Sequence, residues 1–163
     1  MITRTLFILR HARATAPLPG QRDYDRALDA RGWEDGKALG RLMRDREMHV
    51  RRTVTSGALR TRQTCDALVA GGFGINPATD DDLYHGKTDR YRAVADRYGD
   101  DDLLIVGHNP MISDFVLTLV QPSAANGDFA RGLRKCALAI VTEEKAASPR
   151  FVLKELIEPP FST

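Results

Sequence analysis

The sequence predicts an α/β protein in which helices cover both faces of a central sheet. Three β-prone runs, each too short for a helix, lie at residues 5–9, 52–55 and 102–106, and the first and third of them are mostly apolar. Segments with helical periodicity follow them, at about residues 30–48, 57–69 and 110–120. Because strands that alternate with helices form mostly parallel sheets, this order favours a layered α/β architecture. No linker or repeat divides the 163 residues, so we expect a single domain over residues 1–163.

The remaining elements follow from local signals. Gly36 and Gly40 lie one turn apart in the first helix, which predicts a close approach to a neighbouring element. Before the third helix, Asn109 is a plausible N-cap, and Pro110 suits the first helical position. A further helix is expected near residues 89–98, before the third strand. Two late strands, which can form a hairpin, are expected near the end of the chain. These strands are predicted at residues 137–142 and 151–156.

The composition excludes several classes of protein. No apolar run approaches the roughly 20 residues that span a bilayer, and the apolar stretch at residues 6–9 is too short for a signal peptide. We therefore expect a cytoplasmic protein without membrane association. The sequence pI of about 8.7 is mild, and acidic residues are interspersed with the basic ones, so we expect no nucleic-acid partner. Cys65 and Cys136 are expected to be buried thiols.

Three polar segments directly follow the three predicted strands. They are Arg10-His11-Ala12-Arg13, Ser56 to Thr64, and Gly107-His108-Asn109-Pro110. Open α/β sheets bind ligands at the carboxyl ends of their strands. We therefore expect two imidazoles and at least two guanidiniums to meet at one edge of the sheet.

Such a site is suited to a dianionic phosphate. The guanidiniums would repel a metal cation, and no carboxylate cluster is present to hold one, so we expect neither a metal nor a cofactor. A histidine among fixed positive charges has a lowered pKa and stays neutral and nucleophilic near pH 7. Nucleophilic attack on phosphorus requires that state, and the arginines would stabilise the charge of the transition state.

Each signal alone has a simpler interpretation. An Arg-His dipeptide is common, His108 could be a satisfied histidine at a strand end, and Arg60 could be a solvated helix residue. Arginine makes up 19 of the 24 basic residues, which a compositional habit would also explain. The joint arrangement, with three matches in order after three strands, favours a functional site.

The same segments resemble motifs of the histidine phosphatase superfamily, whose fold is phosphoglycerate-mutase-like. The family's RHG motif stands here as Arg10-His11-Ala12, its SxxxRAxxT motif as Ser56 to Thr64 with Thr61 replacing Ala, and its VGHNP motif as Val106 to Pro110. The stretch Asp23 to Leu28, followed by Arg31-Gly32, is similar to the short bacterial branch.

The resemblance implies a three-layer α/β/α sandwich and a cofactor-independent phosphatase. It makes His11 the phosphoryl acceptor, and it assigns phosphate binding to Arg10, Arg60 and His108, with Asn109 beside them. For the general acid, the sequence offers three candidates. His85 occupies the position where larger members carry a glutamate, although an exposed loop histidine is an equally acceptable interpretation, and Asp81 and Asp82 are rival donors.

Only 47 positions separate Arg60 from His108, which leaves no room for the lid insertion of mutases and sugar phosphatases. An open pocket suits a phosphate presented on another protein. The length and motifs resemble bacterial phosphohistidine phosphatases that act on histidine phosphotransfer domains, and this is the leading hypothesis. The alternatives are a small-molecule or broad-specificity phosphomonoesterase and, from another class, a non-catalytic phosphoprotein-binding module.

Overall fold

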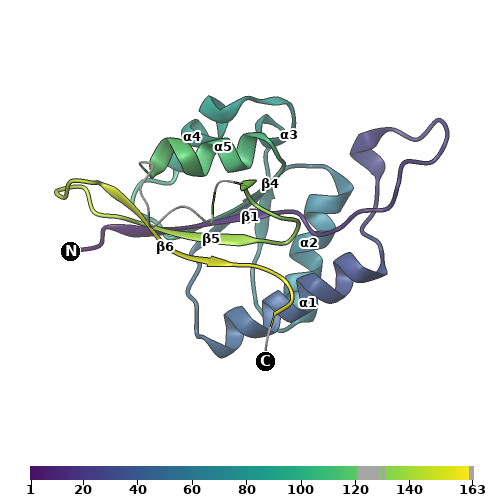
Figure 1. Cartoon of the computed structure of the whole chain (residues 1–163), viewed down its shortest axis with the longest axis horizontal. Coiled ribbons are helices and arrows are strands. Elements are labelled where there is room, and N and C mark those ends of the chain that lie inside the picture. Colours follow the sequence, from purple (N-terminus) through teal and green to yellow (C-terminus); the bar gives the residue numbers. More distant parts are fainter. Residues whose placement is uncertain (121–128, 130, 162–163) are drawn as a thin grey trace.

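A six-stranded mixed sheet forms the centre of the computed structural model, which describes residues 1–120, 129 and 131–161 (Figure 1). The strands occur in the spatial order β3-β2-β4-β1-β5-β6. They are β1 (Arg4–Arg10), β2 (Arg52–Thr55), β3 (Pro77–Thr79), β4 (Leu103–Gly107), β5 (Leu138–Glu143) and β6 (Phe151–Ile157). The first four strands pair in parallel, and β5 and β6 form an antiparallel hairpin beside β1. The predicted mostly parallel sheet and late hairpin are confirmed.

Helices cover both faces of this sheet (Figure 1). One layer consists of α1 (Ala30–Asp45) and α2 (Leu59–Ala70), and the other consists of α3 (Asp82–His85), α4 (Thr88–Arg97) and α5 (Met111–Leu119). A short 3-10 helix, η1 (Asp23–Asp25), lies in the long loop after β1. Residues 61–107 are used by the rest of α2, by β3, α3 and α4, and by β4, so the segment carries no lid insertion. The three-layer sandwich is therefore confirmed.

Alternation along β1 explains why both faces are covered. Leu6 and Ile8 pack with the apolar residues of α4 and α5, whereas Phe7 and Leu9 pack with those of α1 and α2. Successive side chains of a strand point to opposite faces, so a continuous apolar run needs a helix layer on each side. No described helix is long and apolar enough to cross a membrane.

The two glycines of α1 allow a close approach to α2, as predicted. A Cβ atom at Gly36 would lie 2.5 Å from the Cβ atom of Ala67, and one at Gly40 would lie 2.3 Å from the carbonyl oxygen of Leu68. Both distances are shorter than side chains tolerate. The prediction of buried thiols at Cys65 and Cys136 is also confirmed.

The predicted N-cap at Asn109 is wrong. Helix α5 begins at Met111, and Pro110 is the capping residue, without a side-chain hydrogen bond. The Asn109 side chain instead donates to the carbonyl oxygen of Leu133 at 2.9 Å and accepts a hydrogen bond from the Ser113 hydroxyl. These contacts use both ends of its amide, so none remains to cap the helix.

Candidate active site

The two histidines of the motifs meet where β1 and β4 lie side by side. Arg10 pairs with Gly107 in the parallel ladder, and the His11 N–H donates to the Gly107 carbonyl oxygen at 3.1 Å. The chain leaves β1 toward the α1 layer and leaves β4 toward the α5 layer, so the two connections diverge. Such a switch point is where open α/β sheets form their ligand crevices. The rings of His11 and His108 lie 5.3 Å apart, centroid to centroid.

A cavity of about 320 Å³ lies at this point. Its lining is cationic or imidazole-bearing for the most part, and consists of Arg10, His11, Ala14, Arg26, Arg60, His108, Asn109 and Lys135. All the residues predicted to bind phosphate therefore line one cavity. None of the described lining residues is a carboxylate.

His11 is held in one orientation and one tautomer. Its Nδ1 lies 2.7 Å from the Ala12 carbonyl oxygen, which can only accept a hydrogen bond, so Nδ1 carries the proton and the lone pair lies on Nε2. Burial lowers the pKa of His11 to about 3, and the charges of His108, Arg60 and Arg10 act in the same direction. The lowered pKa was expected from the arginines alone, but burial contributes more. His11 is thus a neutral imidazole with a free Nε2 at physiological pH.

His108 is fixed from two sides. Its Nε2 lies 2.6 Å from the Ser56 hydroxyl, and its backbone N–H donates to the Tyr91 hydroxyl at 3.1 Å. Gly107 permits the second contact, because a Cβ atom there would lie 2.3 Å from that hydroxyl. Burial, followed by the charge of Arg60, lowers the pKa of His108 to about 3.

The Ser56 to Thr64 motif joins the loops around the cavity. The Thr64 hydroxyl accepts from the Ala12 N–H at 3.0 Å and donates to the Arg60 carbonyl oxygen at 2.7 Å. The Thr61 hydroxyl lies 2.7 Å from that of Ser56. Thr64 therefore joins the loop after His11 to the helix that carries Arg60, and Thr61 contacts Ser56, which explains why the spacing was informative.

Polar atoms in the cavity wall are left without partners. Among the described residues, the buried side-chain nitrogen and oxygen atoms that lack a hydrogen bond are Arg10 Nε, Arg60 Nε and His108 Nδ1. Burying a polar group without a partner costs about 1–3 kcal/mol, so their gathering in one cavity indicates a ligand that satisfies them. An oxyanion, which accepts hydrogen bonds, is suited to all three nitrogens.

Asp23 binds Arg60 from outside the cavity. The guanidinium donates from Nη1 to the Asp23 carbonyl oxygen at 2.7 Å and from Nη2 to its carboxylate at 2.9 Å. The Tyr84 hydroxyl donates to the same carboxylate at 3.0 Å. Partial burial alone would raise the pKa of Asp23, but the hydrogen bonds from Arg60 and Tyr84 outweigh it and hold the pKa at about 2. The carboxyl group is therefore ionised at neutral pH.

The candidate acids lie outside the cavity lining. His85 is exposed on α3 and stacks edge-on against Tyr84, whose ring also contacts His108. Asp81 accepts hydrogen bonds from the Gly57 N–H and the Tyr24 hydroxyl, both at 2.9 Å, and is thereby a structural contact at the start of α2. Asp82 is exposed in the first turn of α3.

Sequence reasoning assigned no role to Arg26, Lys135 or Asp23. Arg26 and Lys135 line the cavity, and Asp23 holds Arg60. Asp23 and Arg26 belong to the stretch that resembles the short bacterial branch. The motif therefore pointed to these two residues, although their residue types alone did not show what they contact. Lys135 precedes β5 and stands in no motif.

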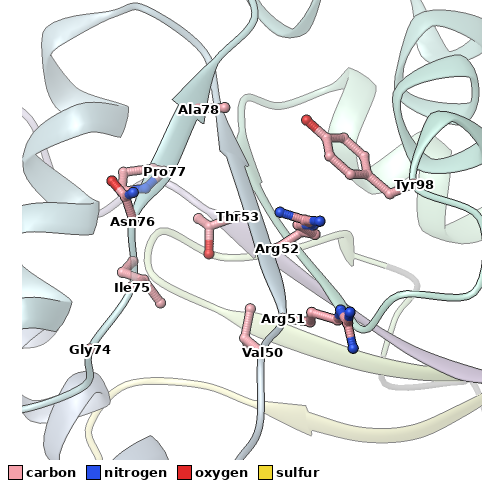
Figure 2. Close-up of a pocket in the computed structure, with 10 residues that line it drawn as sticks. All are labelled: Val50, Arg51, Arg52, Thr53, Gly74, Ile75, Asn76, Pro77, Ala78 and Tyr98. Atoms are coloured by element: carbon pink, nitrogen blue, oxygen red, sulfur yellow. The ribbon is translucent and has the colours of Figure 1, made fainter.

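A larger hollow, of about 750 Å³, lies at the opposite edge of the sheet, where β2 and β3 begin (Figure 2). Figure 2 shows Arg52 and Tyr98 on one side of it and Ile75 on the other. Arg51 and Arg52 both bind Asp101, at 2.9 and 3.1 Å, so their charge is already compensated. The described residues that line the hollow include no histidine, cysteine or carboxylate, and we therefore assign the chemistry to the smaller cavity.

The described part of the chain contains no cluster of side chains that could coordinate a metal ion. No group of three or more histidine, cysteine, aspartate or glutamate side chains is arranged to hold an ion there.

Comparisons with known proteins agree with this site. The sequence model of the histidine phosphatase superfamily (branch 1) matches residues 6–86. The crystal structure of the proposed phosphohistidine phosphatase SixA from Agrobacterium tumefaciens is 25% identical, with a TM-score of 0.86 over 96% of this chain and 99% of that one. The proposed SixA of Nakamurella multipartita is 28% identical, with a TM-score of 0.80 over 96% of each chain. A protein histidine phosphatase SixA bound to tungstate shares the fold, with 19% identity, a TM-score of 0.77, and coverage of 95% and 97%.

Proposed function

Because this chain belongs to the histidine phosphatase superfamily and is a phosphatase, we propose that it hydrolyses phosphohistidine on a phosphotransfer or signalling protein, with His11 as the phosphoryl acceptor. The two similar structures at 25% and 28% identity bear the name of phosphohistidine phosphatases, which supports this substrate class.

The absence of a carboxylic acid among the described residues of the cavity lining carries the choice of substrate. An ester leaves as an alkoxide, which needs a positioned acid to protonate it. The nearest carboxyl that contacts a cavity residue is Asp23, and its pKa of about 2 keeps it ionised at neutral pH. Phosphohistidine leaves as an imidazole, which is protonated with less help. The site is therefore better suited to cleaving a P–N bond than a P–O bond.

The first chemical step uses the free Nε2 of His11. Arg10, Arg60 and His108 supply the unpartnered nitrogens that bind the phosphoryl oxygens. Nε2 of His11 attacks phosphorus, the bond from phosphorus to the substrate nitrogen breaks, and its electron pair stays on that nitrogen, which takes a proton from solvent water and leaves as neutral imidazole. The Ala12 carbonyl oxygen, 2.7 Å from Nδ1, stabilises the positive charge that develops on the His11 ring.

The second step returns His11 to its starting state. Water attacks the phosphoryl group on Nε2, the P–N bond to His11 breaks, and inorganic phosphate leaves. Arginines that bind the equatorial oxygens stabilise both transition states, because charge develops there in each. Asn109 lines the cavity and supports the wall through Leu133 and Ser113, so we assign it a positioning role.

The experiment compares wild type, His11→Ala and His49→Ala on two kinds of substrate. His49 is exposed and lies outside the cavity, so His49→Ala controls for the loss of an imidazole. The substrates are a phosphorylated histidine phosphotransfer domain and a panel of phosphate monoesters, both with EDTA present. We expect fast release from the domain, slow release from the panel, and loss of both in His11→Ala alone. An active His11→Ala enzyme would remove His11 as the nucleophile.

A small-molecule phosphomonoesterase is the second candidate. The cavity volume of about 320 Å³ falls within the range of small-ligand sites, which favours it. Fast release from one monoester, with the phosphorylated domain left intact, would select this function while keeping the same chemistry.

A further inference from the structure

A groove of about 470 Å³ continues from the phosphate cavity along the surface. The two share Arg10 and Lys135 as lining residues, so they lie next to each other. Beyond these residues the groove is lined by Arg13, Arg31 and Arg134 and by one carboxylate, Asp35, with Pro159 and Pro160 at its far side. Its walls come from the loop after β1, the first turn of α1, the turn before β5 and the segment after β6.

The groove carries excess positive charge. Arg13 pairs with Asp29, Arg31 with Asp35 at 3.1 Å, and Arg134 with Glu158 at 3.6 Å. Arg10 and Lys135 form no ion pair with any described residue. Among the lining residues and their ion-pair partners, five cations therefore face three carboxylates. The excess of two equals the net charge of +2 of the whole chain, although it occupies one small surface.

Exposure shows which sign of charge faces the solvent. The side chains of Arg13, Arg31 and Arg134 are 56%, 59% and 61% exposed, whereas their partners Asp29, Asp35 and Glu158 are 23%, 17% and 32% exposed. The carboxylates thus lie behind the guanidiniums. A molecule that enters the groove meets donors that still have free N–H groups, since each guanidinium carries five.

We infer that this groove binds acidic side chains that flank the phosphohistidine of the protein substrate. The inference rests on the proposed function and adds a docking surface to it. A phosphohistidine inserted into the cavity places its own chain across the rim, where Arg10 and Lys135 lead into the groove. Complementary charge there speeds association and selects among partners, and it weakens with salt.

Two phosphohistidine peptides test the inference. One carries aspartate and glutamate around the phosphohistidine, and the other carries asparagine and glutamine at the same positions. For wild type at low salt we expect kcat/KM to be about tenfold higher for the acidic peptide, because several exposed ion pairs each add a modest stabilisation. The preference should shrink as the ionic strength rises.

The variants Arg31→Glu and Arg134→Glu separate docking from chemistry, since neither side chain lines the phosphate cavity. We expect both to lose the preference for the acidic peptide while turnover of the neutral peptide and of phosphoramidate is unchanged. Arg46→Glu is the matched control, because Arg46 is 47% exposed and pairs with Glu155 at 2.8 Å, outside both the cavity and the groove. It should keep the preference.

Three results would overturn the inference, and they show whether the groove alone or the proposed function fails. Equal rates on both peptides in wild type, or equal losses on both peptides in Arg134→Glu, would remove the groove and leave the phosphohistidine phosphatase intact. Release from phosphate monoesters but from neither peptide would overturn the proposed function, and the groove with it.

Discussion

The Ser56 hydroxyl lies 2.6 Å from Nε2 of His108, although 52 residues separate the two in the sequence. The contact arises because β2 and β4 pair in parallel with Thr55 opposite Val106, so the residues that follow each strand emerge together. Ser56 thereby sets the orientation of the ring and leaves Nδ1 of His108 as the buried atom without a partner. A side chain that is not among the cavity-lining residues thus orients one that is.

Replacing Ser56 with alanine should reduce turnover without unfolding the protein. Loss of a hydrogen bond to a buried polar group costs about 1–3 kcal/mol, so we expect kcat/KM to fall roughly five- to 150-fold. Steady-state kinetics on phosphohistidine would measure it, with Thr53→Ala on the preceding strand, β2, as a control for shortening a buried side chain. Unchanged kinetics in Ser56→Ala would show that the ring needs no such support.

Replacing Asp23 with asparagine should tighten the binding of inorganic phosphate. The carboxylate binds Arg60 and is ionised at neutral pH because its pKa is held at about 2, so it opposes the entry of an anion. Asparagine keeps the shape and removes the charge. For a half-exposed group the gain is modest, and we expect the inhibition constant of phosphate to fall about two- to fivefold.

Asp25→Asn is the matched control for that experiment, since Asp25 belongs to the same short helix and pairs with Arg22, which does not line the cavity. Weaker phosphate binding in Asp23→Asn would mean that the carboxylate matters by orienting Arg60 rather than through its charge.

The sequence was informative wherever local pattern and chain order decide the structure. Four consecutive apolar residues at 6–9 imply a strand buried on both faces, and β1 is that strand. Because the carboxyl ends of parallel strands share an edge, the order of the motifs was enough to predict that His11, Arg60 and His108 meet. Gly36 and Gly40 likewise predicted a tight helix contact, since nothing else justifies glycine in a helix interior.

Features that depend on how separate segments pack were out of reach. Lys135 reaches the cavity only because β5 lies beside β1, an order that periodicity does not encode. Asp23 holds Arg60 through a loop whose path after Pro17 and Pro19 no local signal determines. Asn109 has the residue type of an N-cap, but its Oδ1 accepts from the Ser113 hydroxyl while its amide N–H is directed at the carbonyl oxygen of Leu133, 24 residues away.

Replacing His85 with alanine should leave the hydrolysis of phosphohistidine nearly unchanged. The side chain is exposed, lies outside the cavity lining, and touches the site through Tyr84 alone among the aromatic contacts. We expect kcat to stay within about twofold of wild type, as for a surface substitution that costs under 0.5 kcal/mol. A loss of one limb of the pH–rate profile in His85→Ala would instead make it the proton donor.

Replacing Gly40 with alanine should destabilise the fold, although alanine favours helices by about 1 kcal/mol over glycine. The new Cβ atom would lie 2.3 Å from the Leu68 carbonyl oxygen, and such overpacking costs about 1–3 kcal/mol. We expect a melting temperature a few degrees lower. Gly74→Ala is the control, because no atom lies within 4 Å of the Cβ atom it would add, and an equal loss there would contradict the packing argument.

Acid should destabilise the protein through the two buried histidines. Burial lowers the pKa of His11 and of His108 to about 3, whereas an unfolded histidine has a pKa near 6.5. Between these values the unfolded chain binds protons that the folded chain does not, so the free energy of unfolding decreases as the pH falls from about 6.5 toward 3. Above pH 6.5 both histidines are neutral in the folded and in the unfolded chain, so they no longer lower the free energy of unfolding.

Urea denaturation at pH 7 and pH 5 would measure this effect. Each histidine contributes at most about 1.4 kcal/mol per pH unit, so His11→Gln should lose less stability than wild type over this interval. His49→Gln controls for the removal of an exposed imidazole. The difference between wild type and His11→Gln isolates one group from the carboxylates that also titrate in acid. If both lost the same stability, His11 would have to be protonated in the folded state at pH 5, and a lone pair on Nε2 would no longer be assured there.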